Sequence, residues 1–438
     1  MNVCEPFLQE FSAHRDLRRY RVGGAVRDLL LGLPPGDCDW VVVGSSPEEL
    51  LQRGFIPVGG QFPVFLHPHT REEHALARQE RKVAPGHRGF VASFTPATTL
   101  EEDLYRRDFT INAMALDDAH HLHDPWGGMA DLRLRRLRHV SAAFAEDPLR
   151  VLRGARLLAR LASLGFTLAE DTLALMSRIS ASGELATLAP ERVWNETCRA
   201  LSGPAPALYF RTLDLCGALP ALFPELAVLR GIPQPLRYHP EGDVWTHTLL
   251  VLQRAAELET SPLVRFCALA HDLGKGTTPS ELLPGHRGHE DRGVEIVAQL
   301  AARLRLPGQF LRTAQLTTQH HLMGHRLPWQ RPGTVLKVLE SLGALQDPAR
   351  LEPLVLVCQA DDEGRGSRPP SAAPHRAGLI LRECLAAARR HGAADLLARR
   401  PQLAGADLGK ALSQVRRQAI GRVLRRWQKD PAYSNMLN

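Results

Sequence analysis

The sequence predicts an α/β head followed by a long helical body, on three observations. From Tyr20 to about Val140, short apolar runs alternate with turn residues, a pattern typical of strands mixed with short helices. After Asp147 the chain is rich in leucine, alanine and arginine at helical spacing, nearly to its end. Its 438 residues are too many for one ordinary core, so about three domains are expected.

Within the head, three apolar runs predict strands, at 40–43, 64–66 and 74–77. The polar segment 78–98, which contains two glycines and two prolines, predicts a mobile loop instead. Near the C-terminus, segment 365–376 is expected to be a loop by composition.

Composition indicates a globular protein of the reducing cytosol. The chain is 44% hydrophobic and 23% charged, and residues 1–20 offer no apolar signal segment. Its seven cysteines are scattered and never in CxxC spacing, which argues against a disulfide framework or a zinc ribbon. A net charge of +7 suits a polyanionic partner, although an arginine-rich proteome explains it equally well. We expect a cytoplasmic protein without a membrane span.

Two adjacent motifs at the start of the head predict a site for phosphate and metal. The glycine pair Gly23-Gly24 lets backbone N–H groups approach a phosphate, because no Cβ intervenes. Asp37 and Asp39 flank one residue at the start of an apolar strand, so their side chains should share a face, roughly 6–7 Å apart. Such a pair can hold Mg²⁺ beside a nucleoside triphosphate.

A second charged motif follows the predicted loop. Arg106 and Arg107 beside Asp108 and Asn112 suit a triphosphate and a ribose hydroxyl. The alternative is a surface salt bridge at a helix start, which is the commoner use of such residues.

The segment from Glu146 to Arg156 admits two interpretations of Asp147. With Pro148 in the first turn, Asp147 fits the N-cap of a helix. Alternatively, Asp147 accepts and Arg150 donates hydrogen bonds to a nucleobase, a combination that matches cytosine and adenine. Uracil and guanine present the reverse order and would leave buried groups unpaired.

A histidine-rich constellation in the body predicts a metal centre. Imidazoles and carboxylates spread over several helical segments are suitable ligands for a borderline divalent ion. The set is His247, His271, Asp272, His289, His321 and Asp361. For His286, His320 and His325 an ordinary polar surface is favoured.

Taken in order, the motifs resemble those of the class II tRNA nucleotidyltransferases, the CCA-adding enzymes. The motifs are GGAVRD, DCDWVVVG, RRDFTINAMA, HDPWGGMADL, EDPLRVLRGAR and PERVWNE. FPVFLHP and HALARQERK resemble the bacterial members that carry an additional HD domain. The resemblance implies a nucleotidyltransferase head of the DNA polymerase β superfamily, followed by an all-α neck, body and HD domain.

The resemblance also implies roles for individual residues. Asp37 and Asp39 would hold Mg²⁺ for catalysis, and Glu73 lies where a third carboxylate can contribute. Nucleotide binding would fall to Gly24, Arg27, Arg107, Arg153 and Arg156, with base reading by Asp147 and Arg150. His271 and Asp272 would be catalytic in the HD centre, whose ion would be Ni²⁺ or another divalent metal. Leu322 departs from the family, in which an aspartate commonly follows the histidine that matches His321.

The resemblance implies four regions and a set of partners. The expected regions are the head at 1–140, a neck and tRNA-binding body at 141–230, the HD domain at 231–364, and a loop with basic C-terminal helices at 365–438. The expected partners are tRNA, ATP and CTP, with no membrane, and the chain is expected to be a monomer or homodimer. The basic segment 416–429 either contacts the tRNA backbone or is a solvated helix face.

The function implied is template-independent addition of C, C and A to the tRNA 3′ end. HD-domain phosphatase and 2′,3′-cyclic phosphodiesterase or 2′-nucleotidase activity would accompany it. Two alternatives share the head motifs, a poly(A) polymerase and an enzyme that adds only A. A third is an HD phosphohydrolase with a degenerate head, which the retained Asp37 and Asp39 disfavour. A non-catalytic tRNA-binding protein has no need for two aligned carboxylates.

Overall fold

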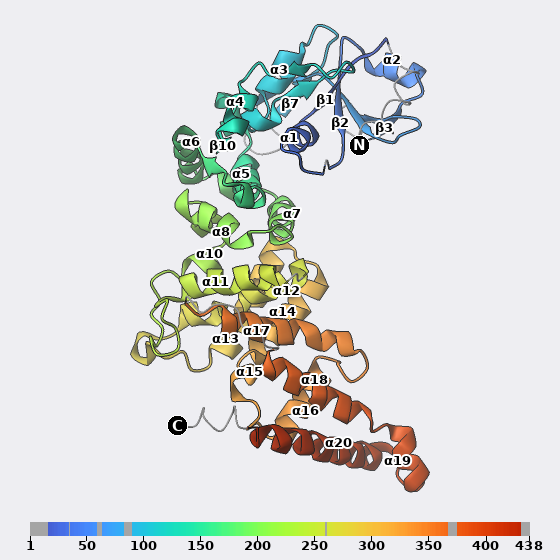
Figure 1. The fold of residues 1–438 in the computed structure, drawn as a ribbon, viewed down its shortest axis with the longest axis vertical. Helices are drawn as coiled ribbons and strands as arrows, with labels where there is room; N and C mark the ends of the chain where they lie inside the picture. Colours follow the sequence, from blue (N-terminus) through green and yellow to red (C-terminus); the bar gives the residue numbers. More distant parts are fainter. Residues whose placement is uncertain are drawn as a thin grey trace. The chain divides into compact units, whose positions relative to one another are not determined.

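The computed structural model describes residues 16–34, 36–58, 64–82, 90–258, 261–366 and 375–430. The chain divides into two compact units, each described by itself below (Figure 1). The first unit contains residues 1–192 and 212–222, and the second contains residues 193–211 and 223–438. The helices α7 (Pro190–Leu201) and α8 (Pro206–Leu215) each contain one of the points at which the chain passes between the units.

A seven-stranded sheet forms the centre of the first unit. Its spatial order is β3-β4-β5-β2-β1-β8-β9, and only the β2–β5 pair is parallel. The strands are β1 (Arg18–Val22), β2 (Asp39–Val43), β3 (Ile56–Val58), β4 (Val64–Leu66), β5 (Glu73–Leu76), β8 (Ala115–Leu116) and β9 (Leu122–His123). The three runs predicted to be strands are thus confirmed as β2, β4 and β5.

Strand alternation divides the core of this unit into two clusters. Val41 and Val43 of β2 pack with Leu100 and Leu104 of helix α3 (Leu100–Tyr105). Val42 points to the opposite face and packs with Leu50 of α2 (Pro47–Gln52). Because successive strand residues face opposite sides, the continuous run of valines satisfies both faces at once.

The remaining elements of the first unit are mostly helical. They are α1 (Gly24–Leu30), η3 (Thr110–Asn112), α4 (Gly128–Arg133), η4 (Ala142–Glu146), α5 (Leu149–Arg160), η5 (Ala162–Leu164), α6 (Glu170–Ala181), η6 (Glu184–Thr187) and α9 (Leu219–Leu222), with the short parallel pair β10 (Arg136–Leu137) and β11 (Thr167–Leu168). The helices predicted after Asp147 are confirmed, and the first of them, α5, begins at Leu149.

The predicted loop at 78–98 is wrong in part. Residues Gln79–Lys82 (β6) and Phe90–Ser93 (β7) pair as antiparallel strands. The sequence around Phe90 is apolar and contains β-forming residues. The loop was predicted because the glycines and prolines of the segment were given more weight than these residues. Residues 83–89 lie outside the described part, as do 367–374 of the predicted loop at 365–376.

The second unit is helical. Its helices include α10 (Pro224–Ala227), α11 (Val244–Glu257), α12 (Pro262–Ala270), α13 (His289–Leu304), α14 (Gly308–His320), α15 (Met323–Arg326), α16 (Pro332–Ser341), α17 (Glu352–Glu363), α18 (Arg376–Arg389), α19 (Ala393–Arg399) and α20 (Gly405–Gln428). A 3₁₀ turn, η7 (Leu273–Thr277), follows α12 and packs on α13.

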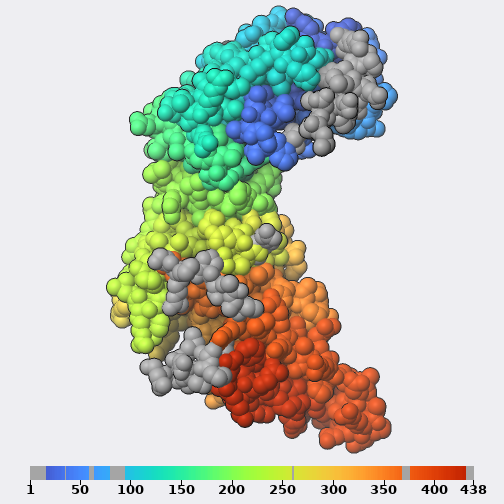
Figure 2. All heavy atoms as spheres, viewed as in Figure 1, coloured from blue at the N-terminus to red at the C-terminus, as the bar shows by residue number. Residues whose placement is uncertain are grey.

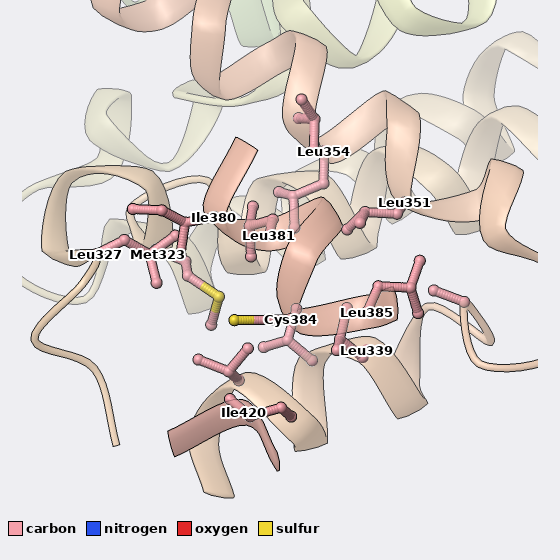
Figure 3. Close-up of a cluster of buried hydrophobic side chains, with 14 of the residues drawn as sticks. Met323, Leu327, Leu339, Leu351, Leu354, Ile380, Leu381, Cys384, Leu385 and Ile420 are labelled. Carbon is pink, nitrogen blue, oxygen red and sulfur yellow. The ribbon is translucent and has the colours of Figure 1, made fainter. Parts of the chain in front are cut away.

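A leucine-rich core joins the last helices of this unit. Met323, Leu339, Leu354 and Ile380 lie in it with Ile420, so that α15, α16, α17, α18 and α20 share one cluster (Figure 3). Because each helix contributes an apolar stripe, α20 is held by burial as well as by its helical propensity. No helix within the described ranges has the length and apolar character needed to cross a membrane.

Candidate active sites

The glycine pair forms the turn from β1 into α1. Gly23 has φ of 75°, a left-handed conformation that favours glycine, and a Cβ there would lie 3.1 Å from Arg107 Nη1. Arg27, four residues on, is buried and donates to Asn112 Oδ1 at 2.6 Å and to Asp28 Oδ1 at 2.7 Å. Burial lowers the pKa of this guanidinium. Arg27 therefore ties α1 to η3.

Three acidic residues gather at one end of the parallel strands. Asp39 is the first residue of β2, and Glu73 is its direct neighbour in the register with β5. The prediction placed Asp37 in the strand with Asp39. In the structure Asp37 lies two residues before β2 begins, so this part of the prediction is wrong. Asp39 is exposed at the strand start, but partial desolvation raises its pKa, Arg107 opposes the shift, and the nearby Glu73 and Asp37 raise the pKa further. An added cation would relieve this repulsion, so the residues fit a site for a divalent cation.

A cleft of about 380 Å³ opens beside these carboxylates. Six arginines and three aspartates lie in its wall, so it is a polar site of positive balance, suited to a polyanion. Its lining is Gly23, Gly24, Asp39, Arg78, Arg106, Arg107, Asp108, Asn112, Asp147, Leu149, Arg150, Arg153 and Arg192. Six residues given a role by the family resemblance are among these: Gly24, Asp39, Arg107, Asp147, Arg150 and Arg153. Gly23, Arg106, Asp108 and Asn112, singled out from the motifs themselves, line the cleft as well. Asp37, Arg27 and Arg156 are not.

Buried carboxylates fix several of the arginines. Asp103 pairs with Arg106 at 2.7 Å and with Arg107 at 3.2 Å, and Asp108 pairs with Arg153 at 2.7 Å. Although burial raises the pKa of Asp108, Arg153 and the amide of Asn112 outweigh it and hold the pKa well below its ordinary value. Salt bridges of the kind weighed as the alternative are thus present, and they line the cleft. Arg107 Nε is buried without a hydrogen-bond partner.

Asp147 and Arg150 lie in the same wall, at the start of α5. Asp147 Oδ1 accepts the N–H of Leu149, the first residue of α5, at 3.1 Å, so its side chain does bind the helix start, although the N-cap position is Pro148 and not Asp147 as predicted. Its other oxygen accepts from Arg192 at 3.0 Å. Arg150 is buried and donates to the carbonyls of Ala143 at 2.6 Å and Arg106 at 2.5 Å. These bonds fix the orientation of both side chains.

Sequence reasoning gave Arg192 no role, although it lies within the quoted motif PERVWNE. The signal was available, because an arginine on a helix that follows a carboxylate-rich motif is a natural ion-pair partner. In the structure its Nη1 is buried without a hydrogen-bond partner, while Nη2 reaches Asp147.

The second unit brings all six predicted metal ligands together. They come from α11, the end of α12, η7, α13, the end of α14 and α17, and none is more than 5% exposed. His271 Nε2 lies 3.2 Å from Asp272 Oδ2, and His247 Nε2 lies 3.1 Å from Asp361 Oδ1. Burial opposes ionisation of Asp272 and Asp361, yet neighbouring cations hold the pKa of both well below the ordinary value.

Unpartnered polar atoms at this centre fit a divalent ion. Buried atoms without a hydrogen-bond partner include Nε2 of both His247 and His271, and Asp272 Oδ1. Among the described residues, three groups of ligand atoms within 4.8 Å of one another include residues of this centre: His247 with His271 and Asp272, Asp272 with His289 and His321, and His247 with His239 and Glu241. Among the described residues the head carboxylates form no group this tight.

Several neighbours of the centre were missed by sequence reasoning. Lys275 Nζ lies 2.6 Å from Asp272 Oδ2, and Glu241 Oε1 lies 2.8 Å from His247 Nδ1. His325 is exposed, as expected of a polar surface residue, but its ring also contacts Asp361 at 2.8 Å and Asp362 at 2.9 Å, a pairing that was not predicted. Partial desolvation lowers its pKa, but the two carboxylates raise it to about 9. Because α15 and α17 are distant in sequence, no local spacing could reveal this contact.

A second cleft, of about 330 Å³, opens at this centre. His289 and Lys275 lie in its wall beside the basic residues Arg287 and Arg326. Leu322, the departure from the family pattern, is also a wall residue.

Three family models match successive parts of the chain. The poly A polymerase head domain matches residues 19–138, the probable RNA and SrmB-binding site of polymerase A matches 165–229, and the HD domain matches 244–363. A multifunctional CCA protein of Thioalkalivibrio sulfidiphilus (strain HL-EbGR7) is 52% identical over 414 residues, which cover 94% of this chain and 100% of the relative.

This chain belongs to the multifunctional CCA protein family. A second member, from Methylococcus capsulatus (strain ATCC 33009 / NCIMB 11132 / Bath), is 51% identical and covers 93% of this chain and 95% of its own length. The family, the enzyme class and the presence of an HD domain are therefore as predicted, and the whole-chain relatives favour neither the poly(A) polymerase nor the degenerate-head alternative.

Solved structures agree on the fold. The crystal structure of the Bacillus stearothermophilus CCA-adding enzyme in complex with CTP has a TM-score of 0.61 and 23% identity, and covers 96% of this chain and 94% of that one. The Thermotoga maritima CCA-adding enzyme complexed with tRNA has a TM-score of 0.56 and 20% identity, with coverage of 96% and 94%. At these identities the likeness confirms the predicted fold class.

Proposed function

We propose that the chain adds C, C and A to the 3′ end of tRNA from CTP and ATP, without a nucleic-acid template. The observation that carries this proposal is one cleft whose wall holds Asp39, the arginines of residues 106–107 and the pair Asp147–Arg150. Chemistry, phosphate binding and base selection would thus share a single nucleotide site.

Different side chains of the cleft would bind different parts of the nucleotide. Arg107 and Arg153 face the cleft and suit the triphosphate, while Arg150 donates to, and Asp147 accepts from, the Watson–Crick edge of C or A. Arg27 would not contact the nucleotide itself but would position Asn112, because its guanidinium donates a hydrogen bond to that side chain. Asp37 and Asp39, with Glu73 beside them, would hold Mg²⁺.

The reaction joins one nucleotide and releases pyrophosphate. The oxygen of the tRNA 3′-hydroxyl forms a bond to the α-phosphorus, the bond from that phosphorus to the β-phosphate oxygen breaks, and the hydroxyl proton is lost. Mg²⁺ held by Asp37 and Asp39 would supply positive charge near the phosphoryl oxygens and would favour loss of that proton to solvent. The chain's own arginines hold the triphosphate in line with the attacking hydroxyl.

Incorporation on a tRNA that lacks its last three nucleotides tests this function. With CTP alone we expect two additions, and with CTP and ATP three. A poly(A) polymerase would ignore CTP, and an A-adding enzyme would extend only a tRNA that already ends in CC. Asp39→Ala should abolish both additions while leaving nucleotide binding partly intact, because every step loses the same transition-state stabilisation. Normal incorporation by this variant would contradict the assignment.

A second activity is proposed for the HD centre, the hydrolysis of phosphomonoesters and 2′,3′-cyclic phosphates. Its support is the buried ligand set together with the basic cleft that reaches it. Ni²⁺ or another divalent ion would be held by His247, His271, Asp272 and Asp361, and further by His289 and His321. Assays with Ni²⁺, Mn²⁺, Co²⁺ and Mg²⁺ test the activity, and absence of hydrolysis with all four would make the centre structural.

The remaining expectations also belong to the proposal. The chain would work in the cytoplasm as a monomer or homodimer, with tRNA as its macromolecular partner. The basic charge of the chain and of its first cleft supports such a partner.

A further inference from the structure

We propose that the basic cleft of the second unit binds a nucleoside phosphate by its base as well as by its phosphate, with the ring of Tyr238 as the surface on which the base stacks. The ligand class is a nucleoside 3′-phosphate or 2′,3′-cyclic phosphate, either free or at the end of an RNA chain. The inference rests on the hydrolase activity proposed above, because it concerns the same cleft. It goes further by assigning a residue that distinguishes nucleotides from other phosphate esters.

Tyr238 is an aromatic residue that the fold leaves open to solvent. It is 56% exposed and lies in the wall of the cleft. The guanidinium of Arg237 lies over its ring, 5.6 Å from the ring centroid. Unpaired nucleobases stack on aromatic rings and on arginine guanidinium planes, so the two side chains together suit a base. Because the ring lies in a cleft wall, a bound ligand can contact it.

A tight turn presents this ring. The backbone N–H groups of Tyr238 and His239 both donate to the carbonyl oxygen of Pro235, at 2.9 and 3.0 Å. Proline has a fixed φ, so the residue that begins the turn has little freedom. Pro235 also lies in the cleft wall and adds apolar surface to it.

Two side-chain hydrogen bonds tie the start of this turn to other residues of the cleft wall. His286 Nε2 donates to the carbonyl oxygen of Pro233 at 3.0 Å, and its Nδ1 lies 2.9 Å from Thr278 Oγ1. The buried Lys275 Nζ donates to Gln234 Oε1 at 2.7 Å. His286 and Lys275 are themselves wall residues. The turn is therefore held in place before a ligand arrives, which lowers the entropic cost of binding.

The same wall supplies cations for a phosphate. Arg287 and Arg326 are exposed wall residues, and within the described ranges neither guanidinium pairs with a carboxylate. Lys275 is a third cation there, and Glu290 is the one carboxylate among the described wall residues. Three cations against one carboxylate favour an anionic ligand, and guanidinium groups suit phosphate oxygens.

The combination of ring and cations favours a nucleotide over a phosphate ester that lacks a base. The cleft volume of about 330 Å³ lies at the small end of the range for small-molecule sites, so it suits a single nucleotide. Every nucleobase has a π-face, so stacking on Tyr238 accepts all four bases. We therefore expect this cleft to require a base without selecting one.

Binding of a fluorescent nucleotide to the full chain tests the stacking role without relying on turnover. The probe is 2-aminopurine riboside 3′-phosphate, whose fluorescence falls when its base stacks, and a chelator is present so that metal-dependent hydrolysis does not occur. Tyr238→Leu should weaken binding to this cleft about 5- to 150-fold, the effect of losing one base–aromatic stack. Tyr238→Phe keeps the ring and should bind as the parent does.

Leu236→Ala is the matched control. Leu236 is 70% exposed and only two residues from Tyr238, but it is not a wall residue, so its loss should leave binding unchanged. The head is unaltered in all four proteins, so its contribution to the signal cancels. Equal binding by the parent and Tyr238→Leu, or an equal loss in Leu236→Ala, would overturn the proposal.

Hydrolysis separates this proposal from the activity on which it rests. Tyr238→Leu should lower kcat/KM for adenosine and cytidine 2′,3′-cyclic phosphates about 5- to 150-fold, mainly by raising KM. It should leave the hydrolysis of glycerol 2-phosphate, which has no base, unchanged. Normal nucleotide hydrolysis by Tyr238→Leu, or equal losses on both kinds of substrate, would overturn the stacking role alone. Stacking that depends on Tyr238 in a chain without hydrolysis would overturn the proposed activity alone.

A further arm distinguishes a free nucleotide from an RNA end. The same probe base is placed at the last position of a short single-stranded RNA with a 3′-phosphate. Quenching that depends on Tyr238 with this RNA would identify an RNA end as the ligand, and such quenching with the mononucleotide alone would identify a free nucleotide. Quenching that Tyr238→Leu leaves unchanged with both ligands would overturn the proposal.

Discussion

Individual carboxylates in the first cleft serve the fold while facing the proposed nucleotide. Asp147 caps α5 through Leu149 N–H and pairs with Arg192, and Asp108 holds both Arg153 and Asn112. Structural and functional roles are therefore not exclusive at these positions. Substitutions that keep one role and remove the other can separate them.

Asp147→Ala should weaken selection against UTP and GTP, because the acceptor for the exocyclic amine of C and A is lost. Base contacts of this kind discriminate by roughly 1–3 kcal/mol, so the preference for CTP and ATP should fall about 5- to 150-fold. The measurement is relative incorporation of the four nucleotides. Asp147→Asn is the matched control for capping, since its amide oxygen can still accept from Leu149. It should lose selectivity while the melting temperature stays near that of the parent. Unchanged selectivity in both variants would leave only the capping role.

Asp108→Asn should lower stability at neutral pH and not in strong acid. The folded pKa of Asp108 is depressed, so its contribution is complete above the unfolded value of about 3.9 and is lost as pH falls through the folded pKa. Loss of a buried charged hydrogen bond costs about 1–3 kcal/mol. Thermal unfolding of the full chain at pH 7, 5 and 3 should show a gap in melting temperature that narrows at pH 3. A gap independent of pH would point to altered packing instead.

The sequence predicts which residues lie together when they belong to one short motif. The sequence placed Gly24, Asp39 and Arg107 in motifs whose chemistry agrees with the cleft they line. It could not identify His325, whose partners Asp361 and Asp362 lie on another helix, because such pairing depends on tertiary packing. The roles of the individual site residues remain predictions.

At the scale of elements, close backbone packing positions the HD ligands. Gly274 in η7 lies against α13, where a Cβ would come 1.9 Å from His289 O and 2.6 Å from Gly293 N. Asp272 precedes this turn and His289 begins α13. The glycine therefore allows two metal-ligand elements to approach closely, a requirement that sequence periodicity does not reveal.

Gly274→Ala should separate η7 from α13 and displace Asp272 from His289. Overpacking of this kind costs about 1–3 kcal/mol, and a misplacement near 1 Å reduces catalysis about 100-fold. Phosphohydrolase rate and melting temperature are the measurements. Gly409→Ala is the control in the same unit, since a Cβ in α20 meets nothing within 4 Å, and it should leave the rate unchanged. Normal hydrolysis by Gly274→Ala would show that the contact is dispensable.

The basic helix α20 has one face packed in the core and another that carries exposed arginines. Ile420 and Leu424 enter the core, and Glu383 accepts from Trp427 Nε1 at 2.7 Å and from Arg426. The outer arginines remain exposed, and the red surface in Figure 2 belongs to this helix and its neighbours. A helix was predictable from leucine and arginine spacing, whereas the contacts of Trp427 were not, because they depend on α18. A role in binding tRNA stays a prediction.

At the scale of the whole molecule, the two candidate sites belong to different compact units. The first cleft is lined by residues 23–192, all in the first unit, and the HD ligands lie between residues 247 and 361 of the second. The change along the sequence, from short apolar runs with turn residues to helical spacing, predicted an α/β head followed by helices. The family comparison confirms this order. The four-part boundaries proposed from the sequence remain a prediction.

Because the sites use separate ligands, losing one should spare the other. His271→Ala should abolish phosphate release from 2′,3′-cyclic or 3′-phosphorylated nucleotide ends, since Nε2 of this buried histidine is directed at Asp272. Nucleotide addition should continue within about twofold, because the head has its own carboxylates and base-reading groups. Both rates are measured on one preparation, with Asp39→Ala as the reciprocal variant. If well-folded His271→Ala stopped nucleotide addition, the two centres would have to be coupled across the units, and their proposed independence would be wrong.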